Sequence, residues 1–177
     1  IYTEGITKLT DLDFMYAKEM GLTIKLIGSA KKTGNRFSAM VSPKLISNEH
    51  PLAGVNGVMN AIFVKGNVLG DVMFYGAGAG KLPTASAVVA DVVDAVKHQG
   101  TNIMTIWEQD KVELGDRANF ACRFFVRVAD TTSKETIEKV FGEVEYVTLA
   151  DVSGEYAFLT EKLTEGCLLY TSPSPRD

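Results

Sequence analysis

Three glycines alternate with alanines in the run Gly76-Ala77-Gly78-Ala79-Gly80, which is the stretch of this chain best suited to chemistry. Glycine has no Cβ and adopts positive φ freely, so such a loop lets the backbone approach a ligand closely. The run fits neither the dinucleotide fingerprint GxGxxG nor the phosphate loop GxxxxGK[ST]. Two interpretations stay open, a ligand-binding loop and a loop that only permits tight packing of a strand on a helix.

Regular elements on both sides would position this loop. Residues 61–75 contain two apolar runs around a turn at 65–67 and predict a hairpin that leads into it. Valines then recur at helical spacing, which predicts a helix that starts at Thr84 or Ala85 and ends near Lys97. The unpaired N–H groups and the positive dipole end of that helix would favour an anionic or polar ligand at the loop.

Other side chains with chemical potential have simpler explanations. His50 precedes Pro51 and is therefore held extended in a polar loop, and Asn56 precedes a glycine in a tight turn. The cysteines, Cys122 and Cys167, show no disulfide or metal spacing. We therefore assign neither a metal site nor a catalytic residue to this chain.

The remaining pattern predicts two further structured regions. A capping-box-like start at Thr10 indicates a helix that stops at Gly21, and residues 22–41 then alternate as a hairpin that Pro43 ends. After a polar stretch come a strand over 120–128, a helix capped at Thr132 and two more strands. The order β, α, β, β is typical of the opening of a ferredoxin-like unit.

Composition excludes several classes of protein. The 177 residues are 46% hydrophobic and 23% charged, with a net charge of −4 and acids and bases mixed along the chain. No basic stripe is present, which argues against nucleic acid or an anionic membrane surface as a partner. No apolar run reaches transmembrane length, and no signal peptide is recognisable, so we expect a cytoplasmic protein.

Both ends of the chain are unusual. The sequence starts at Ile1 without methionine, and we expect native sequence upstream of it. Residues 167–177 change in character and resemble a sequencing-library transposase adapter translated as protein. We treat these residues as a non-native tail, so Cys167 is not counted as a natural cysteine.

Three longer motifs carry a family resemblance: EGITKLT at residues 4–10, HPLAGVNGVMNAIFVKG at 50–66 and GDVMFYGAGAGKLPTASAVVADVVD at 70–94. Together with the βαββ pattern, they resemble the C-terminal half of homoserine dehydrogenase over residues 1–166. The resemblance implies NAD- or NADP-dependent interconversion of L-homoserine and L-aspartate 4-semialdehyde, a step towards threonine, methionine and isoleucine. It also implies a homodimer or a higher homo-oligomer.

The resemblance assigns a role to the glycine loop. It places the loop beside the nicotinamide, with Gly78 and Thr84 touching the cofactor and Gly76 and Gly80 shaping the loop. The family's dinucleotide fingerprint, its catalytic lysine and its substrate-binding acids are absent from this sequence. Hydride transfer needs both halves of the site, so we expect the 177-residue chain to be inactive alone.

We therefore predict an α+β fold in which a mixed or antiparallel sheet with helices on one face is followed by a truncated ferredoxin-like unit. The expected divisions are a substrate-binding and dimerisation domain at 1–100, a linker at 101–117, an ACT-like regulatory domain at 118–166 and the tail at 167–177. An amino-acid effector such as threonine would bind the ACT-like domain. The alternative function is a non-catalytic amino-acid-binding or dimerisation module.

Overall fold

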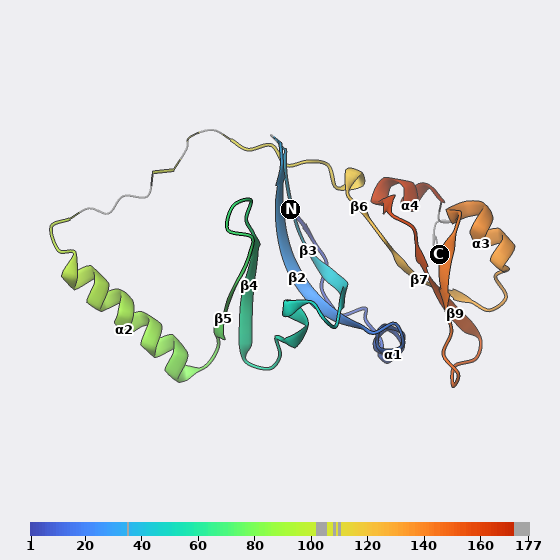
Figure 1. Ribbon diagram of the computed structural model, residues 1–177, viewed down its shortest axis with the longest axis horizontal. Helices are drawn as coiled ribbons and strands as arrows, with labels where there is room; N and C mark the ends of the chain where they lie inside the picture. The colour runs from blue at the N-terminus through green and yellow to red at the C-terminus, as the bar shows by residue number, and fades with distance from the viewer. Residues whose placement is uncertain (35, 102–105, 108, 110, 172–177) are drawn as a thin grey trace. The chain divides into compact units, whose positions relative to one another are not determined.

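The structure is a computed structural model that describes residues 1–171 except 35, 102–105, 108 and 110. The chain divides into two compact units, one formed by residues 1–47 and 112–177 and the other by 48–111. We describe each unit by itself. The mixture of helices with small, mainly antiparallel sheets confirms the predicted α+β class (Figure 1).

The first unit begins with one helix and a long hairpin. Its elements are β1 (Tyr2–Thr3), α1 (Asp11–Glu19), β2 (Leu22–Thr33) and β3 (Arg36–Ser47). The sheet order is β1-β3-β2; β1 runs parallel to β3, and β2 runs antiparallel to it, from Leu22 opposite Ser47 to Thr33 opposite Arg36. Gly21, at φ 67°, makes the turn between α1 and β2 that the glycine stop predicted.

The prediction that Pro43 ends the second strand of this hairpin is wrong, because β3 continues to Ser47. The C=O of Val41 points towards β1 and accepts the Glu4 N–H at 2.8 Å. Pro43, two residues further on, presents its nitrogen to the same side, where β1 has already ended. The missing N–H therefore breaks no ladder bond, as is usual for proline on an open strand edge.

The rest of the first unit contains the predicted βαββ order. It comprises η2 (Arg117–Asn119), β6 (Ala121–Cys122), β7 (Phe125–Ala129), α3 (Lys134–Phe141), β8 (Val144–Val147), β9 (Glu155–Thr160), β10 (Leu163–Thr164) and α4 (Glu165–Thr171). Strands β7, β9 and β8 form an antiparallel sheet in that order, and β6 pairs with β10. A central third strand between two strands joined by a helix is the ferredoxin-like arrangement.

Two details of this region differ from the sequence prediction. The strand expected over 120–128 is interrupted, because the Phe124 N–H donates to Oγ1 of Thr160 at 3.0 Å and leaves the ladder between β6 and β7. Helix α3 is capped by Ser133, whose hydroxyl accepts the Thr136 N–H at 3.2 Å, and not by Thr132. In both cases a hydroxyl satisfies a backbone donor at a position that a local pattern does not specify.

The β7-β9-β8 sheet is packed on both faces. On one face Tyr156 and Phe158 of β9 pack with Ile137 of α3. On the opposite face Val147 and Ala157 pack against the buried side of α1. Alternate residues of β9 thus belong to different clusters, as the two-residue period of a strand requires. Helix α1, which is more than a hundred residues away in the sequence, supplies the second layer.

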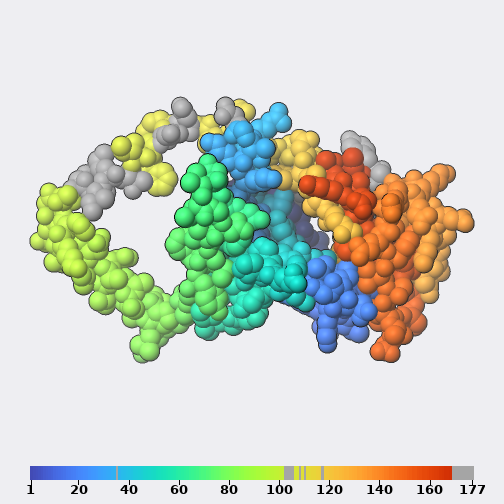
Figure 2. Space-filling model, viewed as in Figure 1, coloured from blue at the N-terminus to red at the C-terminus, as the bar shows by residue number. Residues whose placement is uncertain are grey.

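The second unit holds the glycine loop. Its elements are η1 (Pro51–Gly54), β4 (Met59–Lys65), β5 (Asp71–Ala77) and α2 (Lys81–Lys97). The predicted hairpin is present, with Met59 opposite Ala77 and Lys65 opposite Asp71. Helix α2, which is coloured yellow-green in Figure 2, has no buried residue. Throughout the described residues, no helix is long and apolar enough to span a membrane.

Candidate functional site

The glycine loop joins the end of β5 at Ala77 to the start of α2 at Lys81. The helix therefore begins three residues before the predicted Thr84. Pro83 lies in the first turn, where a backbone N–H has no partner inside the helix, so proline is tolerated there and does not mark the boundary. The Thr84 N–H makes an early helical hydrogen bond, donating to the carbonyl of Gly80 at 3.1 Å.

Gly80 is the N-cap residue of α2 and has φ 118° and ψ 154°. This conformation is almost confined to glycine, because a Cβ would meet the adjacent carbonyl. The packing around Gly80 is ordinary, since the nearest heavy atom to a built Cβ is Cδ of Pro83 at 3.5 Å. Gly80 is thus required by its backbone angles, which aim the chain from the strand into the helix.

Gly78 differs from Gly80 in that it lies close to Asn60. A Cβ at position 78 would clash with Nδ2 of Asn60 and would lie 3.0 Å from its Cγ. Asn60 stands on β4 directly opposite Gly76, so the hairpin register brings its amide over the loop. A side chain at position 78 would therefore have to displace the Asn60 amide, which is the end of a flexible side chain. Sequence reasoning missed Asn60, because the predicted turn at 65–67 is shorter than the observed one and would place Asn60 opposite a different residue.

Gly76 has neither requirement. It does not adopt positive φ, and no heavy atom lies within 4 Å of a Cβ built on it. Nothing among the described residues therefore demands glycine at this position. The residue faces open space at the end of β5, so the backbone there is open to a closely approaching ligand.

The four residues predicted to bind cofactor lie within one short segment, and all are exposed: Gly76, Gly78, Gly80 and Thr84. The first turn of the 17-residue helix α2 follows immediately, with Lys81 as its first residue. The open N–H groups of that turn and the lysine charge make the segment favourable for a ligand that carries negative charge.

His50 and Asn56 have structural contacts within the same unit. Nδ1 of His50 accepts the Leu52 N–H at 3.1 Å, so the neutral ring carries its proton on Nε2, and the ring packs 5.0 Å from that of Phe63. The Asn56 amide donates to the Gly54 carbonyl at 3.4 Å. Both residues shape the loop around η1. Among the residues that the structure describes, no cluster of three His, Cys, Asp or Glu side chains could hold a metal ion.

The contact between Gly78 and Asn60 yields a prediction about local stability. We expect Gly78→Ala to displace the Asn60 amide and to destabilise the β4–β5 hairpin by about 1 kcal/mol, in the range of mild overpacking. Hydrogen–deuterium exchange of peptides covering 59–77 measures this as faster exchange. The same change is then made in a protein that already carries Asn60→Ala, where the added methyl group has room. In that background, Gly78→Ala should change the exchange rates much less than it does in the parent protein. Additive effects would contradict the contact.

A family model described as homoserine dehydrogenase matches residues 1–93, which is more than half of the chain. The chain belongs to the homoserine dehydrogenase family. The matched residues include β4, β5 and the whole glycine loop, so the resemblance stated from the three motifs is confirmed.

Individual homoserine dehydrogenases agree with this membership. The chain is 52% identical over 96 residues to that of Pseudomonas aeruginosa, covering 54% of this chain and 22% of the relative. It is 36% identical over 140 residues to that of Helicobacter pylori, covering 79% of this chain and 33% of the relative. The chain therefore spans about a fifth to a third of the length of these curated relatives.

Solved homoserine dehydrogenases have a similar fold. The crystal structure from Thiobacillus denitrificans matches with a TM-score of 0.78 at 30% identity, covering 96% of this chain and 42% of that one. The structure from S. aureus at pH 6.0 matches with a TM-score of 0.69 at 30% identity, covering 95% of this chain and 43% of that one. The similarity extends beyond residues 1–93 into the ferredoxin-like region.

Proposed function

We propose that this chain is part of an NAD- or NADP-dependent homoserine dehydrogenase that interconverts L-homoserine and L-aspartate 4-semialdehyde, and that residues 76–84 form one wall of its nicotinamide site. The observation that carries the proposal is the glycine loop, which lies within the family match at residues 1–93. At Gly76 no structural requirement for glycine exists, and a cofactor placed against the backbone supplies one.

The residues present fit a dinucleotide cofactor. Gly76 and Gly78 would let the backbone approach the nicotinamide, while Gly80 sets the direction of the loop and Thr84 offers an exposed hydroxyl from the first turns of α2. The cofactor would supply the hydride acceptor or donor. The chain's own residues would exclude water from one side and hold the ring in register with the substrate.

Turnover requires groups that this sequence does not contain. No GxGxxG motif occurs in it, and a hydride donor must be held against its acceptor from both sides. We therefore expect the 177-residue chain to be inactive by itself and the activity to belong to a longer protein. Such an enzyme, with a soluble cofactor and small polar substrates, would work in the cytoplasm on the way to threonine, methionine and isoleucine.

The other predicted roles remain part of this proposal. The β7-β9-β8 topology supports an ACT-like regulatory domain at 118–166, with an amino acid such as threonine as its effector. Large exposed apolar side chains on the second unit support assembly into a homodimer or a higher oligomer. These include Ile62, Phe74, Val88, Val92 and Val96, which are between 57% and 67% exposed. The division at 1–100, 101–117 and 118–166 likewise stays a prediction.

A chimera tests the enzymatic proposal. The 96-residue matching segment of the Pseudomonas aeruginosa homoserine dehydrogenase is replaced by the corresponding residues of this chain. We expect homoserine-dependent reduction of NAD or NADP at a rate similar to that of the parent enzyme, and none from the 177-residue chain. A chimera that has the parent's circular dichroism and oligomeric state but no turnover would sink the proposal.

A further inference from the structure

Helix α1 and the ferredoxin-like sheet share a buried interface. Tyr16 and Ala17 of α1 are 0% and 2% exposed, and Tyr16 packs against Val147 and Ala157. The ring of Tyr16 also lies 5.6 Å from that of Phe125 on β7. The helix therefore covers the face of the sheet that α3 leaves open. A movement of this sheet would therefore change the packing of α1.

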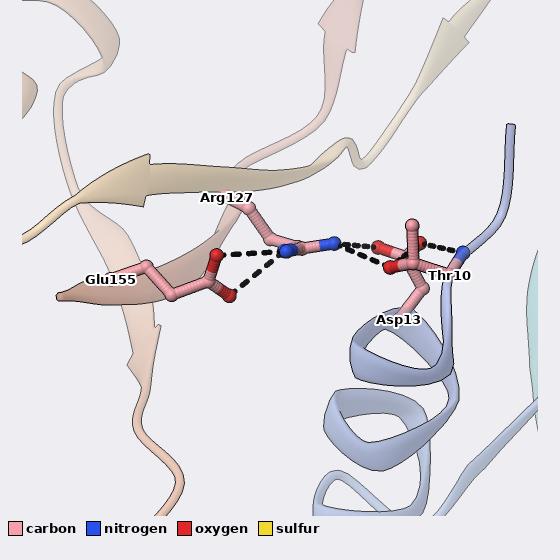
Figure 3. A network of polar contacts seen from close by, with 4 residues as sticks. All are labelled: Thr10, Asp13, Arg127 and Glu155. Atoms are coloured by element: carbon pink, nitrogen blue, oxygen red, sulfur yellow. Dashed lines mark hydrogen bonds and ion pairs between the residues drawn. The ribbon is translucent and has the colours of Figure 1, made fainter. Parts of the chain in front are cut away.

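Arg127 on β7 forms the polar part of the same interface (Figure 3). Its Nε and Nη2 atoms donate to the two carboxylate oxygens of Glu155 at 3.0 and 2.8 Å. Its Nη1 atom donates to Oδ1 of Asp13 at 2.9 Å and to Oγ1 of Thr10 at 2.9 Å. One guanidinium thus holds the sheet with one edge and the start of α1 with the other, which the planar fork of arginine allows.

The partners of Arg127 on α1 are the residues that define where the helix begins. Thr10 is the N-cap, and Oδ2 of Asp13 accepts both the Thr10 N–H at 2.7 Å and the Thr10 hydroxyl at 2.9 Å. The bond from the Thr10 N–H to Asp13 is the return half of the capping box, which stabilises a helix start. At the other end, α1 passes through Met20 and Gly21 directly into β2, so the helix connects the Arg127 cluster to the long hairpin.

Burial and hydrogen bonding have opposite effects on the pKa values of the two carboxylates in this cluster. Hydrogen bonding to Arg127 lowers the pKa of Glu155. Partial burial acts to raise the pKa of Asp13, but the Thr10 N–H and Arg127 outweigh it, so that pKa is also lowered. The side chains of Arg127, Asp13 and Glu155 are between 15% and 24% exposed, and all three stay charged at neutral pH.

The interface also contains a buried tyrosine hydroxyl. Burial raises the pKa of the Tyr16 hydroxyl, and the nearby charge of Glu155 raises it further. A partly buried ion pair adds little net stability compared with apolar packing, but its hydrogen bonds are directional. The Arg127 cluster therefore constrains how α1 lies on the sheet, in addition to the apolar contacts of Tyr16.

We propose that Arg127 is the positioning residue of a latch between the ferredoxin-like unit and the N-terminus of α1, through which a conformational change in that unit reaches the hairpin β2–β3. When β7 and β9 hold the guanidinium in place, the start of α1 is fixed. When they move, Thr10 and Asp13 lose their shared donor and the first turn of α1 loosens. The latch consists of residues outside the glycine loop, and its action does not depend on a particular effector.

Hydrogen–deuterium exchange on the full 177-residue chain tests the latch. We expect Arg127→Met to speed exchange of amides in residues 11–19 by about tenfold or more, because breaking a partly buried ion pair leaves Asp13 and Glu155 without their cation. Arg123→Met is the matched control, since Arg123 binds Glu145 and the Thr160 carbonyl, which both belong to the ferredoxin-like sheet. This control should leave residues 11–19 unchanged.

A second variant keeps the proposal testable if Arg127→Met does not fold. Arg127→Lys keeps the charge, but its single ammonium group cannot bridge both Glu155 and the Thr10–Asp13 pair. We expect intermediate exchange in residues 11–19 for this variant. The proposal is overturned if either variant folds and changes exchange only in the ferredoxin-like sheet, or if Arg123→Met loosens α1 as much as Arg127→Met does.

Discussion

Replacing Phe158 by alanine should lower the free energy of unfolding of the first unit by about 3–5 kcal/mol. Phe158 is 0% exposed at the centre of β9, and its ring lies 5.4 Å from that of Phe141 and 6.3 Å from that of Tyr146. The substitution removes this apolar surface and leaves a cavity among residues that strands and α3 hold apart. Because domains are stable by only about 5–15 kcal/mol, the unit would lose at least about a fifth of its stability.

Urea unfolding followed by far-ultraviolet circular dichroism measures this effect. The matched control is Phe14→Ala on α1 in the same unit, where the side chain is 49% exposed, and we expect a loss of about 1 kcal/mol or less. Equal losses for the two variants would show that Phe158 is not at the centre of a packed core.

Changing Gly80 to alanine should lower the activity of the assembled enzyme. A residue with a Cβ at φ 118° and ψ 154° is strained by about 1–3 kcal/mol, and the loop relieves this strain by shifting the start of α2. If the loop lines the nicotinamide site, such a shift in the homoserine dehydrogenase chimera should lower kcat/KM by about tenfold to a hundredfold, since each tenfold corresponds to about 1.4 kcal/mol. Steady-state kinetics with homoserine and NAD or NADP provide the measurement.

Gly76→Ala separates the ligand interpretation from strain. Position 76 has room for a methyl group and needs no positive φ, so this variant should unfold like the parent protein. In the chimera, however, the methyl group would stand between the strand and the cofactor, and we expect a raised KM for NAD or NADP. An unchanged KM would mean that the cofactor does not approach Gly76, and the proposed role of this residue in the nicotinamide site would be wrong.

Local chemistry made much of this fold predictable. The Thr10–Asp13 capping box and the Gly21 stop define α1, and the alternation of residues 22–41 gives the first hairpin. The βαββ order followed from the same kind of local evidence. Each of these features depends on residues that are neighbours in the sequence or separated by one helical turn, so a single sequence carries the signal.

The features that sequence reasoning missed depend on distant residues. Arg127 reads as one more outward-facing cation on a strand, and only the docking of α1 brings Asp13, 114 positions away, to its guanidinium. The interruption of the strand at Phe124 depends on Thr160, 36 positions away. Likewise, the amide of Asn60 reaches Gly78 only once β4 and β5 pair. Long-range side-chain contacts leave no periodic trace, which explains these errors.

The candidate site contains both kinds of feature, those that local sequence predicts and those that only the structure reveals. The loop and its helix were located from composition and spacing, whereas the separate reasons for Gly76, Gly78 and Gly80 emerged only from backbone angles and neighbouring atoms. The three glycines look the same in the sequence but differ in the structure. Gly80 has backbone angles that favour glycine, Gly78 lies close to Asn60, and Gly76 faces open space.

The Arg127 cluster also has an evolutionary consequence. One set of hydrogen bonds joins Thr10, Asp13, Arg127 and Glu155. A substitution at any of these positions therefore leaves a charged group or a hydrogen-bond donor at another position without its partner. Family members that dock the ferredoxin-like unit on α1 should therefore keep or replace these positions as a group. In sequences that lack the ferredoxin-like unit, the residues at positions 10 and 13 should vary as they do at any helix N-cap, because Arg127 is not there to bind them.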